Sequence, residues 1–495
     1  MFIPSVNPKS KTPLYLQIIQ QVIEMVEQDI LKPGSILPPT RTMAARLGVN
    51  RSTVYNAYQE LWAQGYIESR PGSYSRIRRR PKTRGFASRP REGVLRWPDM
   101  ATSASETLYR EFLKFHPERL PEEPREAIID MASLNMDPRL VPAESFRHTA
   151  NRVMLRHGAA IMGYGDHRGY PPLRATIAER MRLHGITVDK DDILITNGSQ
   201  NGLELVLKLL SRPDRAVVVE SPTYAIALPL FRFHGAKLVP IPMTPTGMDL
   251  AGLRKTLASR RIAFVYTMPN FQNPTGITTS QAHREALISI CREFRIPIVE
   301  DGFEEEMKYF GKVPLPIKSM DREHIVVYLG TFSKVFAPGL RLGWVTADRP
   351  GIDRLLAIKR FSDLSSSTLL QATMHGFFQH GHYEFHIKRM HRIFRKRMTH
   401  ALDALKRHLR PTSAVWQAPS GGYLIWMRLG KRIPPEVLLD ECLRQGVLVS
   451  PGHYYFTHPP EGTYLRLSIA TLDEGEIEEG ITRLGQAVNR VKDGM

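Results

Sequence analysis

Short apolar runs alternate with helix-length segments along the chain from about residue 130 onward. This alternation constrains the fold more than any other feature, because strands buried on both faces read as continuous apolar runs. Residues 202–211 and 281–294 are examples of the helix-length segments between the runs. The pattern predicts an α/β fold with a largely parallel, doubly wound sheet. The predicted strands have the sequences DILIT, RAVVVE, AKLVPI, RIAFVYT, IPIVED and HIVVYLG.

Polar side chains follow several of these runs, at the end where doubly wound sheets bind ligands. One run leads into NGSQNG, which opens a helix, and exposed N–H groups at a helix start suit a phosphate. Any one of these residues alone would be read as a surface charge, a helix cap or a packing residue. Complementary groups at five strand ends indicate a common site. They are Ser199, Gln200, Tyr224, Asn273, Asp301, Thr331, Ser333 and Lys334, with Arg341 just beyond.

Together these groups predict a site for pyridoxal 5'-phosphate. Lys334 would supply the amine for a Schiff base, and Asp301 would keep the pyridine nitrogen protonated, so these two carry the predicted catalytic roles. Asn273 would donate to the phenolate oxygen of the ring, and Tyr224 would stack on its face. The predicted phosphate ligands are Ser199, Gln200, Thr331, Ser333 and Arg341.

The N-terminal part of the chain is strongly basic. The first 92 residues carry fifteen Lys or Arg against six Asp or Glu, and the whole chain has a net charge of +19. This excess favours a polyanionic partner. Residues 14–26 and 40–48 have helical patterns, and a further helix is predicted from Asn50, a good N-cap residue. Two short strands about a Pro-Gly turn follow it.

The helix that follows Asn50 has two different faces. Val54, Ala57, Tyr58, Leu61 and Trp62 form an apolar stripe, and polar side chains lie opposite. A solvated helix face beside an ordinary hairpin would account for each part separately. The order of helices, tight turn and wing, in a basic block, instead predicts a winged helix-turn-helix that binds double-stranded DNA.

Residues 12–77 resemble the DNA-binding domain of GntR-type regulators, through PLYLQIIQQV and LKPGSILPPTRTMAARLGVNRSTVYNAYQELWAQGYI. The resemblance implies DNA contacts from an arginine after the Leu-Pro pair, from the start of the recognition helix and from the wing. In this chain those residues are Arg41, Arg51, Ser52, Thr53 and Gly72. The wing reads PGSYS instead of the usual Gly-x-Gly, which is a departure from the family pattern.

Residues from about 130 to the end resemble the fold-type I, class I/II aminotransferases. The motifs are YGDHRGYPPLR, NGSQNGLEL, NPTG, VEDGF, TFSKVFAPGLRLGW and YLRLSIA. The resemblance implies a smaller C-terminal α+β domain, a Tyr164 that reaches the phosphate in the neighbouring subunit, and an Arg466 that pairs with the carboxylate of a substrate or effector. Two departures are Phe303, where such regulators usually have tyrosine, and SLNMDPRLVP, which lacks the usual Gly-x-Pro near the substrate.

A GntR-type domain ahead of an aminotransferase-like domain resembles the MocR-type regulators, which implies a head-to-tail homodimer. The expected domains are a winged helix-turn-helix at 10–78, a basic linker at 79–125 and the aminotransferase-like domain at 126–495. A small subdomain is expected from roughly 375. The stretch from Arg76 to Arg91, which runs from the end of the winged domain into the linker, has eight Lys or Arg. It would be either a solvated spacer or an additional arm that contacts DNA phosphates.

Further sequence features narrow the cellular context. The two cysteines, Cys291 and Cys442, give neither a disulfide framework nor a metal-ligand spacing. No apolar run approaches the length of a membrane span, and the first residues lack the pattern of a signal peptide. We therefore expect a cytoplasmic protein without a metal site or a membrane partner.

These expectations favour a transcriptional regulator that senses an amine, an amino acid or pyridoxal 5'-phosphate by aldimine exchange at Lys334. Two alternatives remain at this point. The chain could be an aminotransferase of an amino acid with an accessory DNA-binding domain, or a regulator that keeps partial transaminase activity. A basic nucleoid-type protein with a structural cofactor is disfavoured by the complete set of groups around Lys334.

Overall fold

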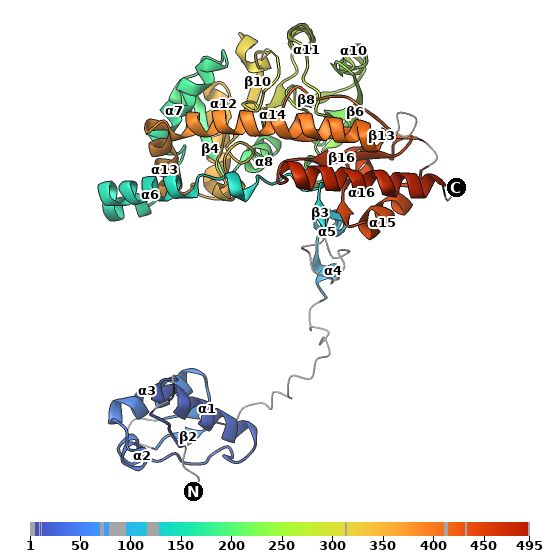
Figure 1. Ribbon diagram of the computed structural model, residues 1–495. Coiled ribbons are helices and arrows are strands. Elements are labelled where there is room, and N and C mark those ends of the chain that lie inside the picture. The colour runs from blue at the N-terminus through green and yellow to red at the C-terminus, as the bar shows by residue number, and fades with distance from the viewer. Residues whose placement is uncertain are drawn as a thin grey trace. The chain divides into compact units, whose positions relative to one another are not determined.

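The computed structural model describes residues 5–8, 10, 12–69, 74–78, 96–115, 128–311, 314–409, 414–430 and 433–493. The chain separates into two compact units, Met1–Trp97 and Pro98–Met495, each with its own core. Figure 1 shows the elements of both.

The first unit is a small helical domain with a two-stranded hairpin. Its elements are α1 (Leu14–Glu27), α2 (Thr40–Leu47), α3 (Arg51–Ala63), β1 (Ile67–Glu68) and β2 (Arg76–Ile77). Strands β1 and β2 pair antiparallel, as a wing requires. Gly48 ends α2 in the left-handed region at φ 65°, which glycine adopts without steric cost. The helix-turn-helix and wing predicted from the sequence are therefore present.

The predicted start of α3 is confirmed, and one detail of its apolar stripe is wrong. Asn50 occupies the N-cap position, but its side chain makes no capping hydrogen bond. The apolar stripe of α3 is narrower than predicted, because Val54, Ala57, Tyr58 and Leu61 are buried while the Trp62 side chain is 57% exposed. Spacing alone placed Trp62 with the stripe, yet the core of this small unit does not extend far enough to cover it.

The second unit is built on an eight-stranded mixed sheet. The strand order is β4-β11-β10-β9-β8-β5-β6-β7, in which β10, β9, β8, β5 and β6 are mutually parallel. Strand β11 lies antiparallel between β4 and β10. All six predicted runs are strands of this sheet, so the doubly wound α/β prediction is confirmed. Their bounds are β4 (Ile193–Thr196), β5 (Ala216–Ser221), β6 (Lys237–Thr244), β7 (Gly247–Met248), β8 (Ile262–Thr267), β9 (Ile298–Asp301), β10 (Val326–Thr331) and β11 (Gly343–Thr346).

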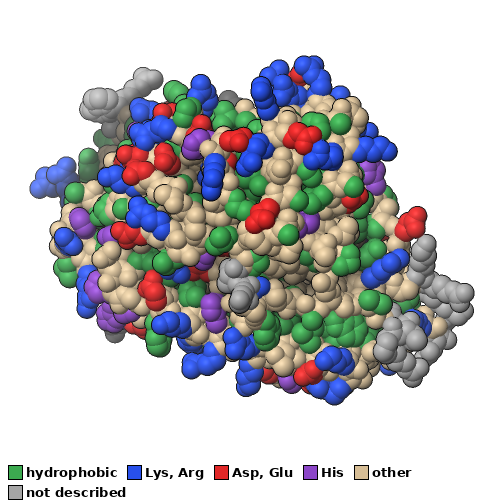
Figure 2. All heavy atoms as spheres, turned by 90° about the horizontal axis from the view of Figure 1, so that it is seen from above, with side chains coloured by type: hydrophobic (Ala, Val, Ile, Leu, Met, Phe, Trp, Pro, Cys, Tyr) green, Lys and Arg blue, Asp and Glu red, His purple; other side chains and the backbone are tan. Residues whose placement is uncertain are grey.

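Helices cover both faces of this sheet. One face packs against α8 (Ser199–Leu210), α9 (Ala227–Phe233) and α12 (Arg349–Ser362). The other packs against α10 (Leu250–Ser259) and α11 (Gln281–Glu293). Seen from above, the surface of the second unit mixes Lys and Arg with Asp and Glu instead of segregating them (Figure 2).

A smaller α+β layer completes the second unit, as predicted. Its four-stranded antiparallel sheet has the order β12-β13-β16-β15. The long helices α14 and α16 pack along one another beside this sheet (Figure 1). The strands are β12 (Ala414–Trp416), β13 (Leu424–Leu429), β15 (Ser450–Pro451) and β16 (Tyr464–Ser468), with β3 (Ile129–Asp130) pairing to β14 (Val447–Leu448). The helices are α14 (His382–His408), α15 (Pro435–Arg444) and α16 (Glu474–Asp493).

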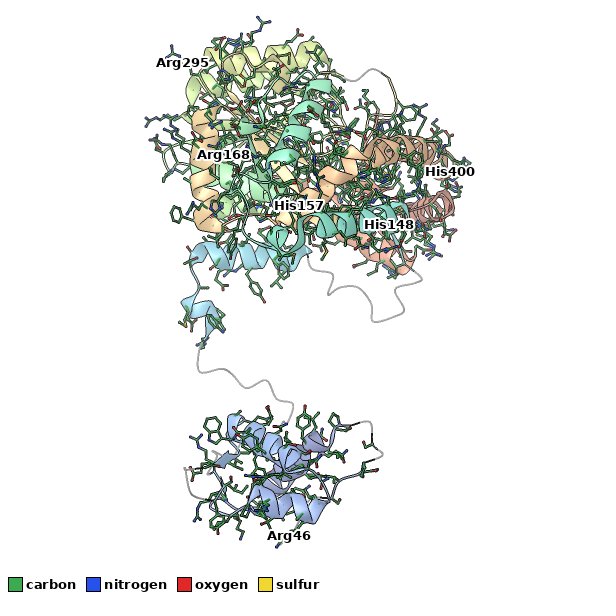
Figure 3. All side chains as sticks on the ribbon, turned by 90° about the vertical axis from the view of Figure 1, so that its left-hand side faces the viewer. Arg46, His148, His157, Arg168, Arg295 and His400 are labelled. Carbon is green, nitrogen blue, oxygen red and sulfur yellow. The ribbon has the colours of Figure 1, made fainter. Side chains whose placement is uncertain are left out.

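Three more helices flank this body. They are α6 (Ala143–His157), α7 (Pro171–Leu183) and α13 (Thr368–Gln379). Figure 3 shows α6 at the surface, with His148 and His157 along it.

Two helices, α4 (Trp97–Met100) and α5 (Ser103–Phe115), stand at the start of the second unit. Helix α5 lies within residues 79–125, the range predicted as the basic linker. It packs on α9 of the second unit. The basic residues between Arg79 and Arg91 lie outside the described residues.

Candidate functional site

The predicted strand-end residues gather in one pocket of about 560 Å³ at the carboxyl edge of the parallel strands. The pocket also takes in Arg466 from β16 of the smaller layer. Its lining includes Ser199, Gln200, Tyr224, Asn273, Asp301, Thr331, Ser333, Lys334, Arg341 and Arg466. Parallel strands bring their carboxyl ends to one edge, which is why residues so distant in sequence meet here.

Asp301 ends β9 and is fully buried beside β8. Its Oδ2 accepts a hydrogen bond from the hydroxyl of Tyr266 at 2.8 Å, and its Oδ1 has no partner among the described residues. Burial raises the pKa of Asp301 to about 6, because the low-dielectric interior penalises the charge. An unpaired carboxylate oxygen facing a pocket is a position for a ligand N–H. Sequence reasoning missed Tyr266, although it lies in a predicted strand.

Lys334 follows β10 and reaches into the pocket. Its Nζ donates to the carbonyl of Leu134 at 2.8 Å, and its own carbonyl accepts from the hydroxyl of Tyr423 at 2.8 Å. Burial lowers the pKa of the Lys334 amine, which increases the fraction of neutral, nucleophilic amine near neutral pH.

Glu304 is a buried carboxyl near Lys334 that sequence reasoning also missed. Neither of its oxygens has a hydrogen-bond partner of acceptable geometry among the described residues. Burial raises the pKa of Glu304 to about 8, while the charge of Lys334 acts in the opposite direction. Glu304 does not line the pocket, so it influences Lys334 through its charge and not through contact with a ligand.

The anion-binding end of the pocket is shaped by two glycines and an arginine. Gly198, at φ 84°, precedes α8, and a Cβ placed on it would lie 2.8 Å from Nη2 of Arg341. A Cβ on Gly343 would lie 2.8 Å from the backbone nitrogen of Ser199. Arg341 donates to the carbonyl of Asn197 at 2.9 Å. The start of α8 and the guanidinium therefore share a space that only glycines leave open, which suits a phosphate.

Arg466 joins the pocket from β16. Its Nη1 donates to Oδ1 of Asn273 at 3.2 Å, and its Nη2 donates to the carbonyl of Ala132. The guanidinium carbon lies 5.2 Å from the ring centroid of Tyr455, which also lines the pocket. The buried Nε has no partner among the described residues. Tyr455 carried no motif that would have identified it from the sequence.

The side chains of the pocket fit pyridoxal 5'-phosphate on the evidence of their unused polar atoms. Oδ1 of Asp301 could accept from the pyridine nitrogen, Oγ of Ser333 could donate to the phosphate, and Nε of Arg466 could donate to a carboxylate. All three atoms are buried and without partners in the described part of the chain. Buried polar groups are rarely left unpaired, so they point to a ligand of matching polarity.

Tyr164 does not join this pocket. Its side chain is 82% exposed, in the loop between α6 and α7. Within one chain it has no access to the phosphate end of the pocket, which leaves its predicted role dependent on a second subunit.

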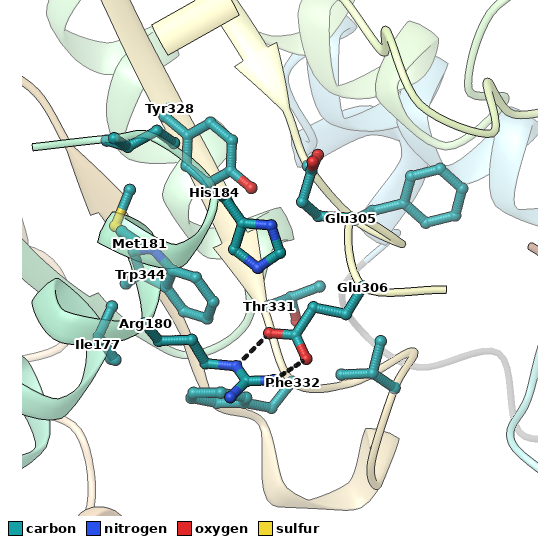
Figure 4. Close-up of a pocket in the computed structure, with 14 residues that line it drawn as sticks. Ile177, Arg180, Met181, His184, Glu305, Glu306, Tyr328, Thr331, Phe332 and Trp344 are labelled. Atoms are coloured by element: carbon teal, nitrogen blue, oxygen red, sulfur yellow. Dashed lines mark hydrogen bonds and ion pairs between the residues drawn. The ribbon is translucent and has the colours of Figure 1, made fainter. Parts of the chain in front are cut away.

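A smaller cavity lies behind the pocket, with Phe303 and Thr331 lining both. Its volume of about 30 Å³ is enough for a single water molecule. Arg180 pairs with Glu306 through Nε and Nη2 at its edge (Figure 4). Phe303 therefore separates the predicted cofactor position from a polar interior space.

In the first unit, Arg41, Arg51 and Ser52 are exposed and Thr53 is half-buried. Arg51 and Ser52 open α3, the predicted recognition helix. Gly72, the predicted wing contact, lies outside the described residues.

Among the described residues, none of the helices combines the length and the hydrophobicity of a membrane span. The same residues include no cluster of three or more His, Cys, Asp or Glu side chains that could bind a metal ion.

Comparisons with known proteins divide the chain in the same places. Residues 129–484 match the family "Aminotransferase class I and II", and residues 14–77 match "Bacterial regulatory proteins, gntR family".

Similar proteins include both regulators and enzymes. The uncharacterized HTH-type transcriptional regulator YdfD of Bacillus subtilis is 30% identical, with 99% of each chain covered. The probable rhizopine catabolism regulatory protein MocR of Rhizobium meliloti is 29% identical, with 96% of this chain and 94% of that protein covered. The crystal structure of the α-aminoadipate aminotransferase LysN of Thermus thermophilus, complexed with N-(5'-phosphopyridoxyl)-L-leucine, covers 81% of this chain and 100% of its own, with 31% identity and a TM-score of 0.74.

Proposed function

Because the chain belongs to the class I and II aminotransferases and joins that domain to a gntR-family DNA-binding domain in the MocR-type architecture, we propose that it is a transcriptional regulator whose pyridoxal 5'-phosphate site senses an amine-bearing effector. The amine could belong to an amino acid or another small molecule, and pyridoxal 5'-phosphate itself is a further candidate signal. The observation that carries the proposal is the pocket in which Lys334, Asp301, Arg341 and Arg466 meet.

Each residue of the pocket has a task in this proposal. When bound, pyridoxal 5'-phosphate supplies an aldehyde that condenses with amines and a ring that withdraws electrons. Asp301, held by Tyr266, keeps the ring nitrogen protonated through Oδ1. Arg341 and the start of α8 bind the phosphate. Lys334 presents a largely desolvated amine, and the amine of the effector would displace it while Arg466 takes the effector's carboxylate.

The first unit would bind double-stranded DNA through α3. Arg51 and Ser52 are exposed at the N-terminal end of that helix, where recognition helices of this motif meet base edges. Arg41 and Thr53 would assist them, and Gly72 would serve in the wing.

We also propose that the protein acts as a homodimer, with the head-to-tail arrangement that the family implies. Two segments of the second unit carry strongly exposed apolar side chains. One contains Leu155 at 87%, Met162 and Tyr164, and the other contains Phe361 at 89% and Leu364. His167 contacts the carbonyl of Leu364 at 3.2 Å, which joins the Tyr164 loop to the end of α12. A second copy covering this surface would bury it and bring its own Tyr164 towards the phosphate.

A second candidate function is an aminotransferase with an accessory DNA-binding domain. The specific observation in its favour is that Lys334 and Asp301, the two groups that transamination needs most, both line the pocket. Relatives named as aminotransferases support it too, among them the 2-aminoadipate transaminase of Thermus thermophilus.

The deciding experiment titrates amines, amino acids and pyridoxal 5'-phosphate while recording cofactor absorbance and operator binding together. A coupling of about 1–3 kcal/mol would change operator affinity by roughly five- to 150-fold. Lys334→Ala and Arg466→Ala should each remove the coupling while DNA binding persists, and Lys334→Ala should abolish the absorbance band of the linked cofactor. Brisk transamination without any effect on DNA binding would instead establish the enzyme.

A further inference from the structure

The pocket contains few charged side chains, and the proposed function uses all of them. Its described lining includes three cations, Lys334, Arg341 and Arg466, and one carboxylate, Asp301. Under the proposed function, Arg341 pairs with the phosphate, Asp301 with the ring nitrogen and Arg466 with the effector's carboxylate. Lys334 is the amine that the effector displaces. No charged side chain of the lining is left for another charge on the effector.

The remainder of the lining is neutral. Apolar side chains come from Leu134, Ile226, Pro338 and Leu448, and neutral polar ones from Asn135 and Ser450. A charged effector side chain placed against this wall would lose hydration without gaining a partner, which is costly. An uncharged side chain would bury apolar surface favourably.

We propose that the effector is an amino acid whose side chain carries no charge, recognised by Arg466 at its carboxylate and by the neutral wall that includes Leu134, Ile226 and Leu448. This inference rests on the proposed function and narrows it, since it excludes dicarboxylic amino acids, diamino acids and polyamines as the natural signal.

Two nearby parts of the structure do not offer a charged contact to the effector's side chain. Glu304 is buried behind Lys334 and does not line the pocket, so it offers no contact to a cationic side chain. A second subunit could add residues through its Tyr164 loop, in which residues 158–165 read GAAIMGYG and bring no charge. The charged residues that follow in this loop, Asp166 and Arg168, already form ion pairs with Arg174 and Asp353 of their own chain.

The test uses three amino acids that share one six-carbon chain: norleucine, 2-aminoadipate and lysine. They differ at the far end, which is a methyl group, a carboxylate or an amine. Titrated into the full-length, cofactor-loaded protein, norleucine should shift the absorbance at a concentration at least about tenfold lower than the other two. Equal or tighter binding of 2-aminoadipate or lysine would overturn the inference. No spectral response to any amine would instead contradict the proposed function.

A variant that adds a positive charge to the pocket wall tests the inference without knowledge of the natural effector. Ile226 is 52% exposed at the pocket wall, so Ile226→Arg can be accommodated without disturbing a core. The variant should bind 2-aminoadipate more tightly by about tenfold and norleucine no better. Ile226→Met is the matched control, because it has similar length and no charge. A similar gain in both variants would mean that size, and not charge, sets the preference.

A separate observation concerns α5, which lies between the first unit and the pocket in sequence. The carbonyl of Lys114 in α5 accepts a hydrogen bond from the hydroxyl of Tyr454 at 2.9 Å. The same helix packs on α9, whose first turn directly follows the pocket residues Tyr224 and Ile226. Next to Tyr454, Tyr455 lines the pocket beneath Arg466.

We infer that α5 is a strap whose docking reports the state of the pocket. It bridges α9 of the large sheet and the Tyr454 turn of the smaller layer, so a movement between these two would change its contacts. An effector that engages Arg466 acts directly on the Tyr455 side of this bridge. In the sequence α5 follows the DNA-binding unit, so a change in its docking would reach that unit through the covalent connection.

Hydrogen–deuterium exchange tests this second inference without DNA. In the loaded protein, the backbone amides of residues 103–114 should change their protection when the effector binds, with norleucine as the first probe. Tyr454→Phe should change the protection of these amides even without an effector and should weaken the effector's influence on operator binding. The spectral affinity should stay within about twofold. Tyr464→Phe, on β16, is the matched control. Unchanged protection of α5 in the presence of a bound effector would overturn the inference.

Discussion

The hydroxyl of Tyr266 donates a hydrogen bond to Oδ2 of Asp301 at 2.8 Å and fixes the orientation of that carboxyl. The two residues lie on neighbouring parallel strands, β8 and β9, so the sheet itself sets their separation. With Oδ2 held in this way, Oδ1 has no hydrogen-bond partner of acceptable geometry among the described residues, and Asp301 lines the pocket. The protein therefore carries a buried carboxylate that a cationic ligand group would compensate.

This arrangement predicts that cofactor-free protein is destabilised by the charge of Asp301. Burial raises the folded-state pKa of Asp301 to about 6, above its value in an unfolded chain, so folding favours the protonated form. The contribution of Asp301 to the free energy of unfolding is therefore greatest at low pH, and it falls as the pH rises from about 4 to about 6. Asp301→Asn should stabilise cofactor-free protein at pH 7 by about 2–3 kcal/mol and have little effect below pH 4.

Chemical denaturation of the cofactor-free variant and parent across this pH range would measure the difference. Asp440→Asn, an exposed position on α15, is the control and should show no such trend. If Asp301→Asn stabilised the protein equally at every pH, the charge of Asp301 would not be the cause of the difference. In the loaded protein Asp301→Asn should have the opposite consequence and slow any amine chemistry, because the ring nitrogen loses its counter-charge.

Much of the fold and of the pocket could be predicted because both follow from pattern. Runs such as IPIVED and HIVVYLG are buried on both faces, so their strand identity does not depend on distant residues. Once the strands are parallel, their carboxyl ends must meet, and Asp301 and Lys334 are placed together by topology alone. The antiparallel β11 was not predicted, because GWVT follows the site motif without a separating helix.

Other features depend on information that the sequence pattern does not contain. Tyr266 reaches Asp301 because of the register between β8 and β9. Glu304 is one of three consecutive glutamates, of which Glu304 and Glu305 are both buried, and nothing in the local sequence distinguishes them from Glu306. The contact between Tyr454 and Lys114 joins residues 340 positions apart. Trp62 follows the helical spacing of a core residue, yet the small unit leaves it exposed.

The phosphate end of the pocket gives a prediction about Gly198. Its backbone, at φ 84° and ψ 167°, lies in a region that essentially only glycine adopts, and a Cβ would lie 2.8 Å from Nη2 of Arg341. Gly198→Ala should therefore displace Arg341 and the start of α8, and weaken pyridoxal 5'-phosphate binding by about tenfold or more. Equilibrium dialysis or fluorescence titration would measure the affinity.

Gly339→Ala provides the control for Gly198→Ala. Gly339 lies two residues before Arg341, and a Cβ there would have nothing within 4 Å. The Gly339→Ala variant should bind pyridoxal 5'-phosphate with the same affinity as the parent. Equal affinity in Gly198→Ala and the parent would show that the phosphate does not bind between α8 and Arg341.

Phe303 gives a prediction about the electronic state of the cofactor. It lines the pocket where such regulators usually have a tyrosine, so the ring oxygen lacks one donor. Phe303→Tyr should supply a hydroxyl that stabilises the ionised oxygen, and the midpoint of the pH-dependent absorbance should move to lower pH. Phe303→Leu, which adds no donor, should not produce this shift. Identical titration curves for Phe303→Tyr and the parent would place the hydroxyl away from the ring oxygen.

The two kinds of basic residue in the N-terminal part should contribute differently to DNA binding. Arg51 opens α3 with an exposed side chain, where it can meet base edges, and a good bidentate pair discriminates between bases by about 1–3 kcal/mol. Arg51→Ala should therefore weaken operator binding more than binding to unrelated DNA. Replacing Arg78, Arg79 and Arg80 with alanine should weaken both alike and flatten the dependence on salt, since phosphate contacts release counterions without reading sequence. Competition binding at two or more salt concentrations would separate the effects. If the arginine-cluster variant lost operator preference while Arg51→Ala kept it, sequence reading would have to be reassigned from α3 to the basic segment.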